Sequence, residues 1–196
     1  MQTTTLSFAN MHNHGELFAN MLRARRELFI VHNKWNLPEA LGMEFDQYDT
    51  PASRWVVVHD EFGQVLAGNR LTPTTAKCGI YTYMIRDAQR GLLDTIPETL
   101  LYEEAPVAET IWESSRLFVS HTVPAGLRRK VHAKLISELG SSARRVGATH
   151  CLTLLNANWP RWSARVGVAM TAMGPVMEIE GIDNQVVTMD FTSALH

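Results

Sequence analysis

Cysteine is scarce in this chain of 196 residues, and neither sign of charge dominates. The two cysteines, Cys78 and Cys151, lie far apart without any metal-type spacing, so we expect two buried free thiols in a reducing compartment. Lysine and arginine together number 18, against 20 aspartates and glutamates, which excludes a strongly basic nucleic-acid-binding protein. We therefore expect neither a nucleic-acid partner nor stable membrane association.

Long apolar runs and targeting segments are also missing. No uninterrupted apolar run reaches the length that spans a bilayer. The first ten residues are polar and free of Lys and Arg, unlike a secretory signal. His12 and His14 have no second ligand cluster at a fitting spacing. We expect a cytoplasmic protein without a metal site.

The composition and the periodicity of the sequence indicate one globular domain with a hydrophobic core. Apolar residues make up 45% of the chain and charged residues 19%. Helical spacing of apolar residues predicts helices over residues 15–33, 86–93, 124–147 and 158–166. Alternating or continuous apolar runs predict strands over residues 54–59, 64–71, 109–119, 148–155, 168–179 and 185–191. Residues 34–52 form a long loop, of the kind that serves as a lid or binding segment.

This order of elements predicts an α/β fold with a mixed, mostly antiparallel central sheet flanked by helices. Residues 109–155 form a strand–helix–strand unit, which predicts a parallel crossover at the sheet centre. The apolar stripe of the crossover helix is Leu127, Val131, Leu135, Leu139 and Val146. The topology resembles the acyl-CoA N-acyltransferase (GNAT-like) fold.

Charged residues lie inside two of the strand-like runs: Arg70 in one, Glu113 and Arg116 in the other. Buried charge is costly unless it is paired or used, so these residues indicate either a structural ion-pair network or a polar active site. A carboxylate such as Glu113 can take a proton from an ammonium, directly or through water. Side chains alternate along a strand, so Glu113 and Arg116 face opposite sides unless a bulge intervenes.

A second group of polar and aromatic residues lies on the first helix and the long loop. Asp46 and Asp49 suit an ammonium or sulfonium, although carboxylates in loops also serve as Asx-turns. Arg25, with Phe29 one turn later and Trp35 just past the helix end, can hold a substrate carboxylate. The alternative for Arg25 is a solvated side chain in a basic run.

Together these residues resemble the LuxI-type acyl-homoserine-lactone synthases, over about residues 21–167. The resemblance is carried by Glu113-Ser-Ser-Arg116 and by Met43-Glu-x-Asp46-x-x-Asp49, with Arg25, Phe29, Trp35 and Arg70. It implies a single domain over residues 1–196, with a mobile substrate-covering region at 1–53 and an acyltransferase core at 54–196. It also implies that an acyl group passes from acyl carrier protein to the amine of S-adenosyl-L-methionine, which is a substrate, so no cofactor is expected. Lactone closure then releases methylthioadenosine, and the product is a quorum-sensing autoinducer.

The resemblance also implies roles for single residues. Asp46, Asp49, Arg70, Glu113 and Arg116 would form the catalytic ionic core. Arg25, Phe29 and Trp35 would close over the nucleotide end of S-adenosylmethionine. Thr153 would contact a 3-oxo acyl chain, although a β-branched residue is equally expected simply to fill a strand.

The identity of the acyl donor depends on residues 120–130, which contain only Gly126 and no Gly-rich pyrophosphate loop. This favours acyl carrier protein over coenzyme A. Basic residues near the start of the long helix, Arg128, Arg129, Lys130 and Lys134, suit an acidic carrier, or else form a solvated helix face. Two competing functions are an acyl-CoA-dependent N-acyltransferase acting on another amine and a non-catalytic ligand sensor on the same fold.

Overall fold

The computed structural model describes residues 1–192, which belong to two compact units. Unit 1 combines Met1–Leu71 with Arg116–Ser142, and unit 2 combines Thr72–Ser115 with the chain from Ala143 onward. Strands β5 (Val65–Pro73) and β6 (Ile111–Val119) and helix α3 (Ala125–Arg145) contribute residues to both units. The expected boundary at residue 53 stays a prediction.

The α/β fold with a mixed sheet is confirmed. The main sheet has the strand order β1-β4-β5-β6-β7-β10-β8, and β9 pairs with β10. Strand β6 pairs in parallel with β7 (His150–Asn156), and α3 connects them, so the predicted parallel crossover is present. Strand β4 (Arg54–His59) has the predicted bounds and pairs antiparallel with β5.

The first predicted helix is present in two parts, both in unit 1. Helix α1 (Leu17–Arg26) buries Leu17, Met21 and Leu22 on one face and continues as a π-helix, η2 (Glu27–His32). The predicted loop after it contains a short hairpin, β2 (Glu39–Ala40) with β3 (Met43–Glu44). The hairpin was missed because two-residue strands leave no periodicity to detect.

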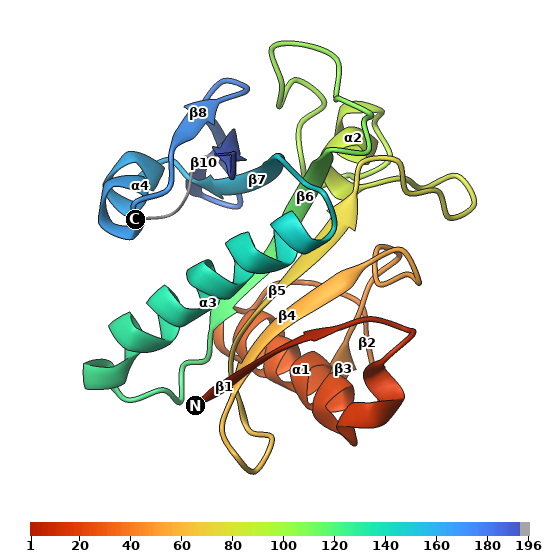
Figure 1. The fold of residues 1–196 in the computed structure, drawn as a ribbon. Coiled ribbons are helices and arrows are strands. Elements are labelled where there is room, and N and C mark those ends of the chain that lie inside the picture. The colour runs from red at the N-terminus through yellow and green to blue at the C-terminus, as the bar shows by residue number, and fades with distance from the viewer. Residues whose placement is uncertain (193–196) are drawn as a thin grey trace. The chain divides into compact units, whose positions relative to one another are not determined.

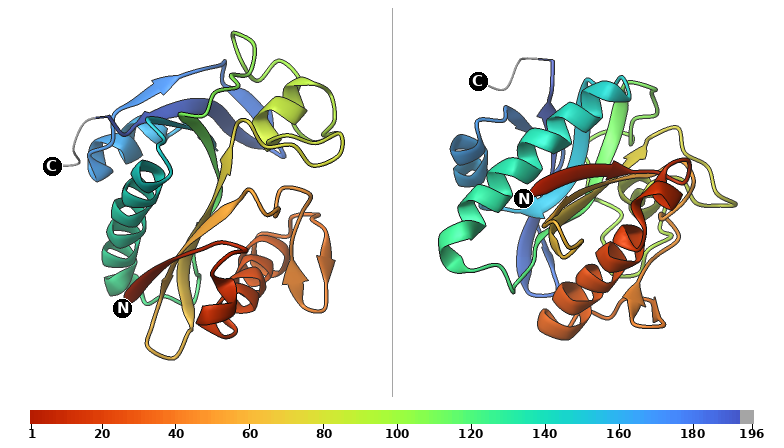
Figure 2. Two further views of the ribbon diagram at one scale, coloured as in Figure 1. Left: turned by 45° about the vertical axis from the view of Figure 1, so that its right-hand side comes forward. Right: turned by 60° about the horizontal axis from the view of Figure 1, so that its bottom comes forward.

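Two helices cover opposite faces of the strands of unit 1 (Figure 2). Helix α1 packs on the face that carries Trp55 and Val57 of β4. Alternation directs Val56 and Val58, which are also buried, to the other face, where residues 125–142 of α3 lie. Val131, Leu135 and Leu139 of α3 are buried as predicted, whereas Leu127 is half exposed.

The N-terminal residues form a strand that the sequence did not predict. Strand β1 (Gln2–Leu6) pairs antiparallel with β4 along one edge of the sheet (Figure 1). It is followed by a short 3₁₀ helix, η1 (Met11–His14). Three consecutive threonines have high strand propensity but no apolar alternation, so the polar content concealed the strand.

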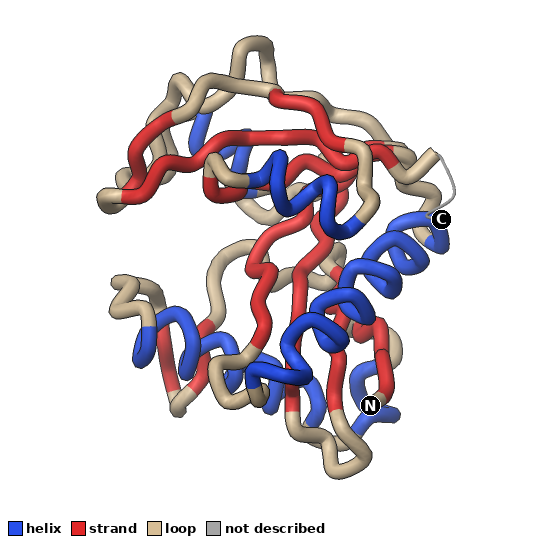
Figure 3. Tube along the Cα trace, turned by 90° about the vertical axis from the view of Figure 1, so that its left-hand side faces the viewer, coloured by secondary structure: helices blue, strands red, loops and turns tan. Residues whose placement is uncertain are grey.

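Unit 2 contains the remaining elements. Helix α2 (Met84–Gln89) begins two residues before the predicted helix. Strand β10 (Ile182–Asp190) pairs antiparallel with β7, with β8 (Met170–Ala172) and with β9 (Met177–Ile179), and Figure 3 shows these strands in red. Helix α4 (Trp159–Val166) follows β7 and ends at Gly167, whose positive φ of 69° suits a glycine.

The expected pair of buried thiols is wrong for one cysteine. Cys151 is buried on β7, but Cys78 is exposed in a turn where it pairs with Tyr81. The exposed turn gave no apolar periodicity from which its burial could have been judged. Among the helices of residues 1–192, none combines the length and the apolar character needed to cross a membrane.

Candidate active site

Six charged side chains of unit 1 form one network of ion pairs, which we call the ionic cluster. Its three arginines come from helix α1, strand β5 and strand β6, and its three carboxylates from strand β3 and the loop that follows. The members are Arg25, Arg70, Arg116, Glu44, Asp46 and Asp49. Five of the six residues belong to the predicted site, so the structure brings these together.

Arg25 is held by two carboxylates at once. Its Nε donates to Glu44 Oε2 at 2.5 Å, and its Nη1 and Nη2 donate to the two oxygens of Asp49 at 2.8 and 3.0 Å. The side chain is only 1% exposed. Arg25 is therefore an internal member of the cluster, and the alternative of a solvated arginine is wrong.

The other two arginines connect the remaining carboxylates. Arg70 Nη1 lies 2.5 Å from Asp46 Oδ1 and 3.1 Å from Asp49 Oδ1. Arg116 Nη2 lies 3.2 Å from Glu44 Oε1 and 2.9 Å from Asp46 Oδ2. Arg116 has the most exposed side chain of the cluster, at 12%. It is therefore the cation that a ligand can reach most directly.

The surrounding arginines keep Asp46 and Asp49 ionised. Burial alone would raise the pKa of Asp49, but the charges of Arg70 and Arg25 outweigh it and hold that pKa well below its usual range. Burial would likewise raise the pKa of Asp46, but the charges of Arg70 and Arg116 outweigh this effect and lower it. Both aspartates remain available as anions that accept hydrogen bonds.

Neutral groups fix the orientation of the two aspartates. The indole Nε1 of Trp55, a fully buried residue of β4, donates to Asp49 Oδ1 at 2.9 Å. The backbone N–H of Tyr48 donates to Asp46 Oδ1 at 2.9 Å, which is the Asx-turn weighed as the alternative role. The loop turn and the ion pair therefore use the same carboxylate.

Three aromatic rings, Phe29, Trp35 and Phe118, form what we call the aromatic stack. Phe29 and Trp35 are parallel, with ring centroids 5.0 Å apart, and Phe118 meets Phe29 edge-on at 5.8 Å. The Arg116 guanidinium carbon lies 5.8 Å from the Phe29 ring centroid, in cation–π range. The stack and the accessible arginine thus adjoin each other in unit 1.

A glycine leaves room for this arrangement. A Cβ at Gly68 of β5 would lie 2.7 Å from Cε1 of Phe118, closer than side-chain carbons approach. The absence of a side chain at position 68 lets the Phe118 ring rest against the strand.

Arg116 reaches the cluster through an unusual backbone conformation. Its φ is 53°, in the left-handed region that a non-glycine residue in a strand rarely adopts. Strict alternation placed Glu113 and Arg116 on opposite faces unless a bulge intervened, and this irregularity changes the direction of the side chain. Strain of this kind is found most often at functional sites.

Glu113 belongs to unit 2, where it meets the start of helix α2. Its Oε1 accepts from the Ile85 N–H at 2.8 Å and its Oε2 from the Met84 N–H at 3.3 Å. The residue is fully buried, opposite Leu152 in the β6–β7 pairing. Burial first, and the Glu113 charge next, raise the pKa of Tyr83, the residue before α2. Glu113 thus satisfies two backbone N–H groups at the start of this helix.

The remaining predicted residues lie on α3 and β7. Arg128, Arg129 and Lys130 are exposed in the first turns of α3, and Lys134 is half-buried. Thr153 is buried in the middle of β7, where its register partner is Val187 of β10.

Glu44 is the member of the ionic cluster that sequence reasoning missed. It is fully buried and pairs with both Arg25 and Arg116. The signal was its position within Met43-Glu-x-Asp46-x-x-Asp49, two residues before the first aspartate. It was passed over because a single Glu beside exposed loop residues gives no sign of burial.

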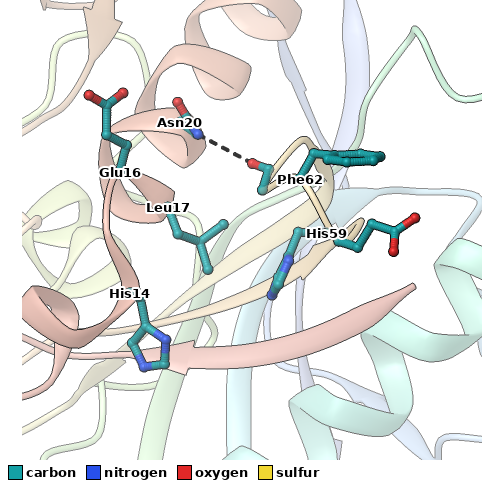
Figure 4. Close-up of a pocket in the computed structure, with 8 residues that line it drawn as sticks. His14, Glu16, Leu17, Asn20, His59 and Phe62 are labelled. Carbon is teal, nitrogen blue, oxygen red and sulfur yellow. Dashed lines mark hydrogen bonds between the residues drawn. The ribbon is translucent and has the colours of Figure 1, made fainter.

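Unit 1 also carries surface clefts near the β4–β5 turn. One, of about 310 Å³, is lined by side chains that include His14, Leu17, Asn20, His59 and Phe62 (Figure 4). Asn20 Nδ2 donates to the Gly63 carbonyl at its edge, at 3.3 Å. The lining groups differ from those of the ionic cluster.

Comparison with protein families gives one match that covers most of the chain. The autoinducer synthase family model matches residues 9–194. An acyl-homoserine-lactone synthase from Ralstonia nicotianae is 30% identical over 169 residues, which are 83% of this chain and 76% of that protein.

Solved structures show the same fold. TofI in a ternary complex with an inhibitor and MTA has a TM-score of 0.78 and 23% identity, over 100% of this chain and 94% of that one. The CoA-dependent acyl-homoserine lactone synthase BjaI, with SAM and isopentyl-CoA, has a TM-score of 0.77 and 21% identity, over 95% and 82%. An acyl-CoA N-acyltransferase from Pseudomonas aeruginosa has a TM-score of 0.61 and 16% identity, over 96% and 99%, which confirms the GNAT-like fold.

Proposed function

The chain belongs to the autoinducer synthase family and is an acyl-homoserine-lactone synthase, an acyltransferase, and from this premise we propose its substrates and residue roles. The acyl acceptor is S-adenosyl-L-methionine and the acyl donor is acyl carrier protein. The observation that carries the proposal is the ionic cluster beside the aromatic stack. That combination matches a ligand with an ammonium, a carboxylate, a sulfonium and an aromatic base.

The ligand's charged groups find partners in the cluster. Arg116, the most exposed of its arginines, binds the substrate carboxylate, since a guanidinium presents paired donors to a carboxylate. Asp46 and Asp49, both kept anionic, attract the ammonium and the sulfonium. Arg70 holds the two aspartates in place.

Phe29 and Trp35 contact the nucleotide end. Their parallel rings offer a flat apolar surface for the adenine, and aromatic faces also attract a sulfonium. Arg25, predicted to close over the substrate, is saturated by Glu44 and Asp49, so we assign it a positioning role within this region.

The proposed reaction has two steps. The substrate ammonium loses one proton to become an amine, which attacks the thioester carbonyl. The carbon–sulfur bond then breaks, and the second proton that leaves the nitrogen passes to the departing thiolate, so that an amide forms and the carrier thiol is released. A substrate carboxylate oxygen then attacks the carbon bonded to the sulfonium, and methylthioadenosine leaves as a neutral thioether. In this proposal Glu113 accepts the proton in the first step, directly or through water, because two backbone N–H groups hold its carboxyl group in a fixed orientation.

Replacement of Glu113 by Gln tests this role. The amide keeps the shape but cannot take up a proton, so we expect methylthioadenosine release to fall by about a hundredfold or more. Glu113→Asp keeps the carboxyl group on a shorter side chain, so it measures how much activity is lost when only the contact with α2 is weakened. Near-normal release by Glu113→Gln would remove Glu113 from the proton transfer.

The donor assignment depends on residues 120–130, where Gly126 is the single glycine. Without further glycines, few backbone N–H groups of this loop can come close to a pyrophosphate, which favours the carrier protein as donor. Coenzyme A is the second candidate, because the similar synthase BjaI is CoA-dependent. The test compares methylthioadenosine release with the same acyl chain on carrier protein and on coenzyme A. A higher kcat/KM with acyl-CoA would overturn the donor assignment while leaving the synthase assignment intact.

A further inference from the structure

Leu127 begins an apolar stripe on helix α3 but does not reach the core. Val131, Leu135 and Leu139 lie one, two and three turns later on the same face and are 1%, 0% and 0% exposed, whereas Leu127 is 52% exposed. Single exposed leucines are common, so exposure alone assigns no role. The surroundings of Leu127 distinguish it.

The surroundings of Leu127 carry positive charge. Arg128, Arg129 and Lys130 follow it and are exposed, and no Asp or Glu occurs between Ser114 and Ser137 of the sequence. Lys130 lies three residues after Leu127, which places it on the same face of the helix. Arg128 Nη1 donates to the Ser120 carbonyl at 3.3 Å, so this guanidinium is partly fixed beside the loop that leads into α3.

We propose that Leu127 is the apolar anchor of a docking surface for an acidic carrier protein, with Arg128, Arg129 and Lys130 around it. This inference rests on the proposed donor. Complementary charge accelerates encounter, whereas a buried apolar side chain at the centre of a contact slows dissociation. The basic residues and Leu127 therefore act on different rate constants of the same complex.

Charge decides between this partner and two others. A second copy of the chain, docked by the same surface about a two-fold axis, would bring like cations together. A membrane-bound helix needs a broad apolar face, and here Leu127 is the exposed apolar side chain among three cations. An acidic protein partner satisfies both the leucine and the cations.

The central test is the KM for acyl carrier protein of Leu127→Ala. Removing an anchor that becomes buried on docking should raise this KM roughly tenfold, which corresponds to about 1.4 kcal/mol. Alanine is the best helix former, so α3 is retained. The KM for S-adenosylmethionine and kcat should stay unchanged. Val176→Ala, at a valine that is 52% exposed like Leu127 but lies in unit 2 outside helix α3, is the matched control and should change neither KM.

Comparison of the two acyl donors separates this inference from the proposed function. With the same acyl chain on coenzyme A, which has no protein surface, Leu127→Ala should match the wild type. Equal KM increases for both donors, or a change in oligomeric state on sedimentation, would overturn the docking role. An unchanged KM for carrier protein in a productive enzyme would also overturn it. Absence of methylthioadenosine release with either donor would instead reject the proposed substrates.

Discussion

Replacing Glu44 by Gln should destabilise the protein more than any exposed charge change does. Glu44 is fully buried and lies between Arg25 and Arg116, so the amide leaves an uncompensated positive charge in the cluster. Breaking a buried ion pair in this way costs about 3–5 kcal/mol. For a chain of this size the melting temperature should fall by roughly 6–20 °C, at about 2–4 °C per kcal/mol.

The assay is urea unfolding followed by circular dichroism, with two comparison variants. Glu16→Gln removes an ion pair to Arg23 whose side chains are 77% and 47% exposed, and it should change the free energy of unfolding by less than about 1 kcal/mol. Glu44→Asp keeps the charge and should retain part of the lost stability. A Glu44→Gln protein as stable as Glu16→Gln would refute the argument that charge balance holds the cluster together.

Three further predictions concern acid stability, the acyl chain and the aromatic stack. Folding lowers the pKa values of Asp46 and Asp49, so their contribution to stability is complete above about pH 5 and is lost as the pH falls below about 4. Asp46→Asn should therefore weaken the pH dependence of the free energy of unfolding, measured with urea, in this range. Thr153→Val is nearly isosteric and should lower the ratio of 3-oxo to unsubstituted lactones measured by mass spectrometry; an unchanged ratio would leave Thr153 as a strand filler. Gly68→Ala should displace Phe118, because the added Cβ would lie 2.7 Å from the ring, and should raise the KM for S-adenosylmethionine roughly tenfold. A second substitution in the same chain, Phe118→Leu, should remove the clash and lower this KM again.

The sequence predicted those elements whose apolar pattern is long or strongly periodic. Strand β4 has the predicted bounds, and the crossover from β6 through α3 to β7 is present. Strand β1 was missed because threonines supply strand propensity without an apolar alternation. The short hairpin of β2 and β3 was missed for want of length.

Burial was harder to predict than secondary structure. Cys78 and Leu127 were assigned to the interior from residue type or periodicity, yet both are exposed, because neither signal shows whether other parts of the chain pack over a position. Glu44 shows the converse. A charged residue in a loop-like segment is fully buried, because two arginines from elements distant in the sequence neutralise it. Such pairing depends on tertiary structure, which local patterns do not contain.

The φ angle of Arg116 explains why two charged residues of strand β6 have different partners. Glu113 follows the regular strand and caps helix α2 in unit 2, whereas Arg116, three residues later, has a φ of 53° and joins the ionic cluster of unit 1. A regular strand at position 116 would have sent the arginine to the face set by alternation. The strained conformation costs about 1–3 kcal/mol, and the two carboxylates that bind the guanidinium offset this cost. The spacing within Glu113-Ser-Ser-Arg116 therefore has a structural meaning only together with the irregularity at Arg116, which lets one strand supply a ligand to helix α2 and a member of the ionic cluster.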